Sequence, residues 1–150
     1  MDQKPVDLRW ISDRLEIEEL LTRYTRAIDA GDWDRLDAVF TADARIDYTA
    51  TGGIAALYAE VKPWLAEMLP VFPRRMHTLG QVESQVSGDR AVVTAYFHNP
   101  MILLPPDGTE QLWEFGGIYH HQLVRTVDGW RSHELVEELV WQRHSAAGRA

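Results

Sequence analysis

The stretch YTRAIDAGDWDRL, residues 24–36, joins the end of one helix to the start of the next. Gly31 is placed to end the first helix, because glycine readily adopts the left-handed conformation that follows a helix. Asp32 can then cap a short second helix, which is predicted to bury Trp33, Leu36 and Phe40. Two helices joined by this tight turn set the layout of the N-terminal part of the chain.

Asp29 lies in the last turn of the first helix, where the helix dipole is negative and a carboxylate is disfavoured. On a helical wheel it lies roughly 100–120° from the centre of the apolar stripe, near an edge that could face a cavity. The alternatives are a solvent-exposed acid or a cap for the next helix, a role that Asp32 fills better. The position marks Asp29 as a candidate functional residue.

The first helix is predicted to start at Asp13, with Glu16 three residues later completing a capping box. Apolar residues then recur at helical spacing, at Ile17, Leu20, Leu21, Tyr24 and Ile28. Residues 44–50, ARIDYTA, alternate as a strand does. Residues 58–72, YAEVKPWLAEMLPVF, indicate a third helix, in which Pro63 is tolerable if it falls within the first turn.

From residue 73 onward the pattern predicts long strands, over residues 74–89, 90–104, 110–127 and 130–144. Ser87-Gly88-Asp89 and Asp128-Gly129 are hairpin signals, and residues 105–108, PPDG, form the loop between the hairpins. Helices followed by an antiparallel meander predict an α+β fold, with helices on one face of a sheet. Strands this long curl, and Gly116-Gly117 is the expected bend or bulge. A curled sheet closed by helices forms a cone, whose interior is the place to look for a ligand.

The composition suits one domain over residues 1–150, with 45% hydrophobic and 25% charged residues. The net charge of −8 argues against nucleic acid or an anionic membrane as a partner. The absence of Cys excludes disulfides, thiolate nucleophiles and thiolate metal sites. The N-terminal residues lack a signal-peptide pattern and no apolar run could span a bilayer, so we expect a cytoplasmic protein.

Tyr24 and His77 are further candidates. Tyr24 lies in the middle of the apolar stripe, within about two helical turns of Asp29, and both could border one pocket. His77 lies early in the first long strand, and imidazole is the side chain best matched to proton transfer near neutral pH. If Asp29 lies beside His77, it would hold the tautomer of the ring and support the imidazolium that forms. A purely structural role is the alternative for Tyr24 and His77.

His98-Asn99 and His120-His121 are neighbouring strand residues whose side chains face opposite sides of the sheet. One member of each pair should face the cavity. The same question, which alternation alone leaves open, applies to Trp113, Glu114 and Tyr119.

The sequence contains few signals of other chemistry. The six His show neither HxH nor HxxxH spacing, so we expect no metal, with a scattered His and carboxylate site as the alternative. A Gly-rich phosphate loop and a GxSxG motif are both absent, so we expect neither a nucleotide cofactor nor a serine nucleophile.

Four segments in order resemble a known family: YTRAIDAGDWDRLDAVFTADARIDY, MHTLGQVE, GDRAVVTAYF and VDGWRSHEL. They are similar to the SnoaL-like branch of the nuclear transport factor 2-like superfamily, which includes scytalone dehydratase and the bile-acid 7α-dehydratases. The resemblance covers the chain from Leu15 to Trp141. It implies a single SnoaL-like domain and a cone-shaped α+β barrel of the cystatin-like type. In such a barrel three N-terminal helices pack on a curled, mixed and mostly antiparallel sheet.

The resemblance also implies catalytic residues. Tyr24, Asp29 and His77 match the catalytic Tyr, Asp and His of the bile-acid dehydratases. Asp29 and His77 also match an Asp and a His in the active site of scytalone dehydratase. Tyr48 matches a tyrosine of that enzyme that holds the water assisting the carbonyl group, while its second tyrosine falls at Ile28.

Other positions depart from the family pattern. Asn99 stands where the bile-acid enzymes have an Asp, and their C-terminal Arg has no counterpart near Leu139. The second active-site His of scytalone dehydratase could be His98 or His120. We expect the substrate-binding residues to be His98, Asn99, Trp113, Tyr119 and His120.

The resemblance implies a dehydratase that uses no cofactor. It would remove water from a small hydrophobic hydroxy-carbonyl compound, such as a polyketide, an aryl compound or a steroid. His77 would be the acid and base, Asp29 would support it, and Tyr24 and Tyr48 would stabilise an enolate. The alternatives are an isomerase or cyclase with Asp29 or Glu114 as its base, and a non-catalytic small-molecule-binding domain.

The resemblance further implies a homodimer or homotrimer. Residues 141–150, WQRHSAAGRA, could be a tail or could cover the mouth of the pocket.

Overall fold

The computed structural model describes residues 7–146. Its helical elements are α1 (Leu8–Ala30), the 3-10 helices η1 (Trp33–Ala38), η2 (Thr49–Thr51) and η3 (Leu69–Val71), and α2 (Tyr58–Met68). Its strands are β1 (Phe40–Asp47), β2 (Ala55–Leu57), β3 (Arg74–Arg75), β4 (Thr78–Ser87), β5 (Arg90–Leu103), β6 (Gln111–Thr126) and β7 (Gly129–Ala146). In these residues, no helix is both long and apolar enough to cross a bilayer.

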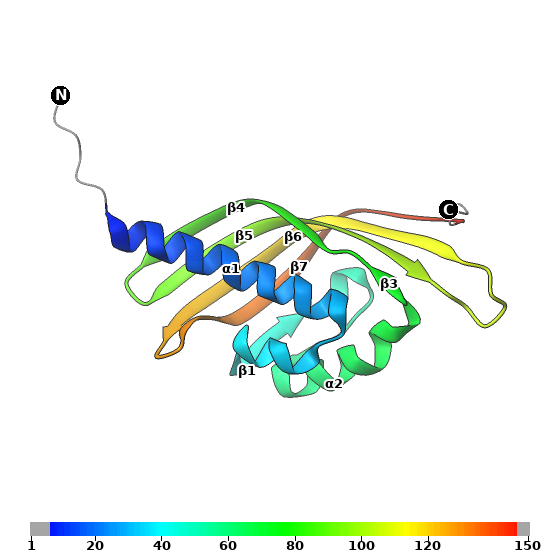
Figure 1. Cartoon of the computed structure of the whole chain (residues 1–150), viewed down its shortest axis with the longest axis horizontal. Coiled ribbons are helices and arrows are strands. Elements are labelled where there is room, and N and C mark those ends of the chain that lie inside the picture. Colours follow the sequence, from blue (N-terminus) through cyan, green and yellow to red (C-terminus); the bar gives the residue numbers. More distant parts are fainter. Residues whose placement is uncertain (1–6, 147–150) are drawn as a thin grey trace, which may run out of the picture.

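The strands form one curled, mixed sheet with the order β2-β1-β7-β6-β5-β3, and β4 also pairs with β5. The pairs β4–β5, β5–β6 and β6–β7 are antiparallel, whereas β1 runs parallel to β7. Over residues 7–146 the sheet curls without closing, so the cone is an open one, bounded by its helices. Figure 1 shows α1 lying across one face of the long strands, with α2 at one end of that face. The predicted α+β fold is confirmed.

The start of the first helix differs from the prediction. α1 begins at Leu8, and the Asp7 carboxylate caps it by accepting hydrogen bonds from the backbone N–H groups of Arg9 and Trp10. Asp13 is buried inside the helix, where it accepts two hydrogen bonds from Arg125 at 2.8 and 3.0 Å. The capping-box pattern misled because an acid with Glu three residues later also occurs within a helix, and the partner of Asp13 is distant in sequence.

The other predicted N-terminal elements are present with shifted ends. The short second helix is the 3-10 helix η1, and the Asp32 side chain caps it by accepting from the N–H of Arg35. Phe40 is buried but already belongs to β1. The third helix ends at Met68, and Pro63 lies in its second turn rather than its first. Proline there removes one backbone hydrogen bond, which the packing of α2 on the core must offset.

The predicted bulge at Gly116-Gly117 is confirmed by a register shift between β6 and β7, since Gly116 pairs with Trp141 and Gly117 with Leu139. A Cβ atom on Gly117 would collide with the carbonyl oxygen of Glu138, and one on Gly116 with the ring of Trp141. The bulge bends both strands and increases their twist, which helps the sheet curl around the space under α1.

Part of the C-terminal segment, residues 141–146, belongs to the last strand. β7 continues to Ala146, which pairs with Gln111. Residues 147–150 lie outside the described residues.

Candidate active site

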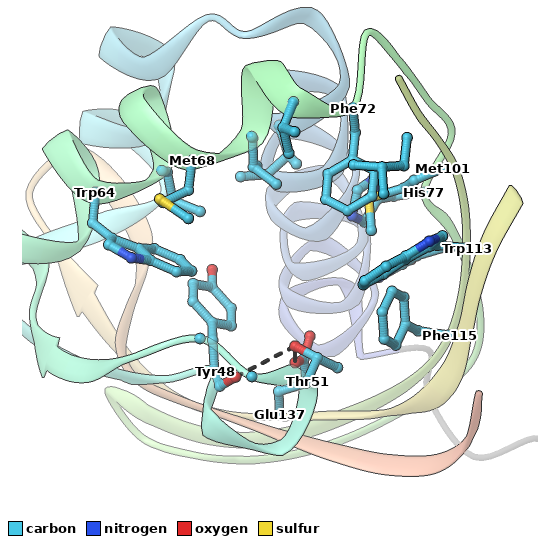
Figure 2. Close-up of a pocket in the computed structure, with 18 of the residues that line it drawn as sticks. Tyr48, Thr51, Trp64, Met68, Phe72, His77, Met101, Trp113, Phe115 and Glu137 are labelled. Atoms are coloured by element: carbon cyan, nitrogen blue, oxygen red, sulfur yellow. Dashed lines mark hydrogen bonds between the residues drawn. The ribbon is translucent and has the colours of Figure 1, made fainter. Parts of the chain in front are cut away.

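A pocket of about 330 Å³ lies between the C-terminal part of α1, the helix α2 and the inner face of the sheet. Its apolar wall includes Trp64, Met68, Phe72, Met101, Trp113 and Phe115 (Figure 2). Its polar lining consists mainly of Tyr24, Tyr48, His77, Asn99, Tyr119 and Glu137. An apolar cavity with a few convergent polar groups is the usual form of a small-molecule site, and this one is at the small end of the range of about 300–1,000 Å³.

Asp29 and His77 meet where α1 ends beside the segment that precedes β4. Nδ1 of His77 lies 2.5 Å from Oδ1 of Asp29, and the backbone N–H of His77 donates to Oδ2 at 2.8 Å. Burial raises the pKa of Asp29, but the hydrogen bonds from His77 outweigh it and hold this pKa below its ordinary value. Asp29 therefore remains ionised. It orients the ring by accepting a hydrogen bond from Nδ1–H, so that Nε2 is the nitrogen available for proton transfer.

Arg75 of β3 explains how the helix end tolerates Asp29. The last turn of α1 has no basic residue of its own, but the Arg75 guanidinium donates to the carbonyl oxygens of Ile28 and Asp29, both at 3.2 Å. It also donates to the carbonyl oxygens of Leu69 and Phe72. A cation at the C-terminal end of a helix is favourable. The unfavourable position of Asp29 is thus offset by a cation from the sheet and by His77.

Tyr24 and Tyr48 form a second polar pair, with their hydroxyl oxygens 2.6 Å apart. Both residues are buried, at 2% and 6% exposure. Burial raises the pKa of each phenol, and for Tyr24 the neighbouring Tyr119 and Tyr48 add to the effect. Both phenols therefore stay protonated. Since one hydroxyl donates to the other, the second can donate its proton to a ligand.

Asn99 and Tyr119 extend this polar lining. Nδ2 of Asn99 donates to the hydroxyl of Tyr119 at 3.0 Å. Oδ1 of Asn99 is buried and has no hydrogen-bond partner among residues 7–146. A buried acceptor without a partner is costly, and a ligand that donates a hydrogen bond would satisfy it.

His98 and His120 lie outside the pocket, although we expected them in the substrate site. The register places His98 and His120 on the outer face of the sheet, where they pair with Glu114 at 3.2 Å and Glu138 at 2.6 Å. Alternation along β5 and β6 turns Asn99 and Tyr119 inward instead. His121 also turns inward, but it is buried and bonded to Ser132, and burial lowers its pKa to about 3. Trp113 lines the pocket as expected.

Glu137 lines the pocket, and our sequence reasoning missed it. Its side chain comes from β7 and is buried, and its Oε1 accepts a hydrogen bond from the Thr51 hydroxyl at 2.5 Å. Burial raises the pKa of Glu137 to about 7, with the charge of Asp47 adding to the effect and Thr51 and Tyr119 opposing it. The available signal was its place between Leu135 and Leu139, because residues two apart in a strand share a face.

The lining can therefore donate hydrogen bonds, orient a histidine base and hold a neutral carboxylic acid. Within residues 7–146, no three His, Cys, Asp or Glu side chains gather as possible metal ligands. The tyrosine hydroxyls, the Asp29–His77 pair and the Glu137 carboxyl group suit acid–base chemistry on an apolar compound.

Comparisons with known proteins agree with this fold. A sequence profile of the SnoaL-like domain matches residues 9–136. An uncharacterized protein of Mycobacterium tuberculosis is 42% identical over 144 residues, which is 95% of this chain and 96% of that protein.

Two solved structures share the fold. A candidate scytalone dehydratase from Novosphingobium aromaticivorans has a TM-score of 0.78 at 18% identity, covering 93% of this chain and 91% of the other. A nuclear transport factor 2-like superfamily protein from Salmonella enterica has a TM-score of 0.71 at 18% identity, covering 93% and 94%. The profile match shows that the chain belongs to the SnoaL-like family, as predicted, and the two structures show that it shares their fold.

Proposed function

Because the chain belongs to the SnoaL-like family, we propose that it is a cofactor-independent dehydratase. Its substrate would be a small hydrophobic compound with a hydroxyl group β to a carbonyl. The observation that carries the proposal is the partly buried Asp29–His77 pair beside a cavity that also holds paired tyrosine hydroxyls. This combination provides a base and hydrogen-bond donors for one enolate-forming reaction.

The first step is removal of the proton α to the carbonyl group. His77 takes this proton on Nε2, because Nδ1 is bound to Asp29. The ionised carboxylate of Asp29 stabilises the imidazolium that forms. An oriented base of this kind typically contributes 10²–10⁴-fold to the rate.

The second requirement is stabilisation of the enolate. The Tyr24–Tyr48 pair supplies a neutral donor from a buried position, where hydrogen bonds to a developing charge are strong. Such donors typically contribute a few kcal/mol each. Because the carbonyl group already acidifies the α C–H bond, the step needs no redox group.

The pocket narrows the substrate class. Its volume of about 330 Å³ and its aromatic wall favour a one- or two-ring aryl compound or a small polyketide over a steroid.

A comparison of turnover by wild type and by a His77 variant tests the proposal. We would assay a panel of β-hydroxy ketones, including the aldol of benzaldehyde and acetone, with wild type beside His77→Ala. His77→Ala should lower turnover at least ~100-fold, because the ring that takes the α proton is removed. Turnover that survives in a folded His77→Ala protein, or ligand binding without turnover in wild type, would contradict the proposal.

A second candidate function is an isomerase that moves a proton on an unsaturated ketone. The raised pKa of Glu137, about 7, favours it, because such a carboxyl group can both take and return a proton. Of the bases considered from sequence, Asp29 is held ionised by His77 and Glu114 is bound to Arg143 on the outer face. Migration of a β,γ double bond by wild type, without dehydration of any β-hydroxy ketone, would favour this candidate.

A further inference from the structure

Glu137 reaches the pocket from a different element than His77. It lies on β7, whereas His77 precedes β4, and both line the same cavity. Figure 2 shows Glu137 beside Thr51, below Tyr48 and apart from His77. The Thr51 hydroxyl donates to Oε1 of Glu137. The pocket thus holds a buried carboxyl group that has no role in α-proton removal by His77.

The neighbours of Glu137 suit a substrate hydroxyl group. Glu137 faces Tyr119 across the β6–β7 register, and Tyr119 accepts a hydrogen bond from Nδ2 of Asn99. Among residues 7–146, Oδ1 of Asn99 has no partner. A hydroxyl group both donates and accepts. It could donate to Oδ1 of Asn99 and accept from the acid proton of Glu137.

The pKa values of Glu137, which lines the pocket, and of Asp29, which binds His77, are shifted in opposite directions. The pocket residues that contact Glu137 or face the same space are Thr51, Tyr24, Tyr48, Tyr119 and His77. Asp47 of β1 supplies the nearby charge. Burial raises the pKa of Glu137, while His77 holds the pKa of Asp29 below its ordinary value. Two carboxyl groups whose pKa values are shifted in opposite directions can take separate roles, one as the ionised form and one as the protonated form.

We propose that Glu137 is the catalytic acid of the dehydration and gives its proton to the departing hydroxyl group. The inference rests on the proposed function. His77 takes the α proton, and the C–H electron pair forms the C=C bond through the enolate. The C–O bond breaks with its electrons on oxygen, which takes the proton of Glu137 and leaves as water. The imidazolium of His77 and the carboxylate of Glu137 then return to their starting forms by proton exchange through solvent.

A change of leaving group tests this role. We would compare the aldol of benzaldehyde and acetone with its acetate ester, because acetate leaves without a proton whereas hydroxide does not. Both give benzalacetone, whose conjugated enone is followed by its ultraviolet absorption. Glu137→Gln keeps the size of the side chain and an oxygen for Thr51, but it has no acid proton. The matched control is Glu138→Gln, whose side chain lies on the outer face beside His120.

We expect Glu137→Gln to lower turnover of the hydroxy ketone at least ~100-fold, a typical effect of removing a general acid. It should turn over the acetate ester at close to the wild-type rate, which also shows that the variant is folded. His77→Ala should lose both reactions, because either leaving group requires α-proton removal. In wild type, turnover of the hydroxy ketone should fall above pH 7 as Glu137 ionises, and this fall should be absent from the residual rate of Glu137→Gln.

The contrary outcomes are distinguishable. Wild-type turnover of the hydroxy ketone by Glu137→Gln would overturn the role of Glu137 while leaving the proposed function in place. Loss of both substrates in Glu137→Gln would overturn the leaving-group role, because the ester needs no acid. If wild type eliminates neither compound, the proposed function fails and the role of Glu137 fails with it.

Discussion

The same kind of pair, a histidine beside a carboxylate, occurs in two settings: beside the pocket, between α1 and the segment that precedes β4, and on the outer face of the sheet. His77 pairs with Asp29 next to a cavity, and its side chain is 8% exposed. On the outer face, His98 and His120 pair with Glu114 and Glu138, and the side chains of these histidines are 47% and 43% exposed. Water reaches both of these histidines, and Glu114, whose side chain is 9% exposed, is also bound by Arg143. Residue type alone does not mark a site. Burial beside a space for substrate does.

Removing the carboxylate from each kind of pair should give the largest difference between the two settings. Asp29→Asn should lower turnover of a β-hydroxy ketone at least ~100-fold, because an amide neither stabilises the imidazolium nor fixes the Nδ1–H tautomer. Glu138→Gln removes the matching carboxylate from the outer face and should leave turnover unchanged. Steady-state kinetics of both variants decides the matter, and equal losses would show that the setting of the pair is irrelevant.

The setting of Glu137 should also be visible in the pH dependence of the free energy of unfolding. Its pKa rises from 4.5 to about 7 in the folded protein, so the fold favours the protonated form. The stability from this group is therefore fully present below about pH 4.5 and is lost as the pH rises through about 7. A shift of this size corresponds to about 3 kcal/mol.

Glu137→Gln should therefore gain stability relative to wild type as the pH rises from about 5 to about 8, by up to about 3 kcal/mol. Urea unfolding at several pH values measures the difference between the two proteins. Glu138→Gln should keep the pH dependence of wild type. A stability difference between Glu137→Gln and wild type that is constant with pH would mean that Glu137 is ionised in the fold.

The bulge that curves the two faces gives a smaller effect. A methyl group on Gly117 would meet the carbonyl oxygen of Glu138 and the ring of Phe97. Gly117→Ala should lower the free energy of unfolding by about 1–3 kcal/mol, as overpacking does. Gly80→Ala is the control, because a Cβ atom there meets no described atom within 4 Å. Equal midpoints of urea unfolding for the two variants would show that the close packing at Gly117 does not contribute to stability.

The smallest effect is expected for a histidine of the outer face. His120→Gln should change the free energy of unfolding by no more than about 0.5 kcal/mol, because exposed ion pairs contribute little. It should not change turnover, since His120 faces away from the pocket. A loss of turnover in this variant would mean that the outer face takes part in the reaction.

Much of the site could be predicted from local signals. Asp29 was singled out by its unfavourable place in the last turn of α1, and His77 by its chemistry. The family resemblance added Tyr48, whose hydroxyl lies against that of Tyr24. Alternation predicted that one member of each His98-Asn99 and His120-His121 pair would turn inward, but not which one. That choice depends on which face of the sheet α1 covers, a long-range property.

The sequence by itself determined the α+β layout, the two hairpins and the bulge at Gly116-Gly117, because turn residues and periodicity act over a few residues. Only the tertiary structure decided where the acidic side chains lie and which groups they contact. Asp13 became a buried partner of Arg125 rather than a helix cap, and Glu114 went to the outer face. Glu137 went to the pocket, although it shares the segment SHELVEELV with two other glutamates. A carboxyl group takes its role from its burial and its partners, and both are set by chain segments far away in sequence.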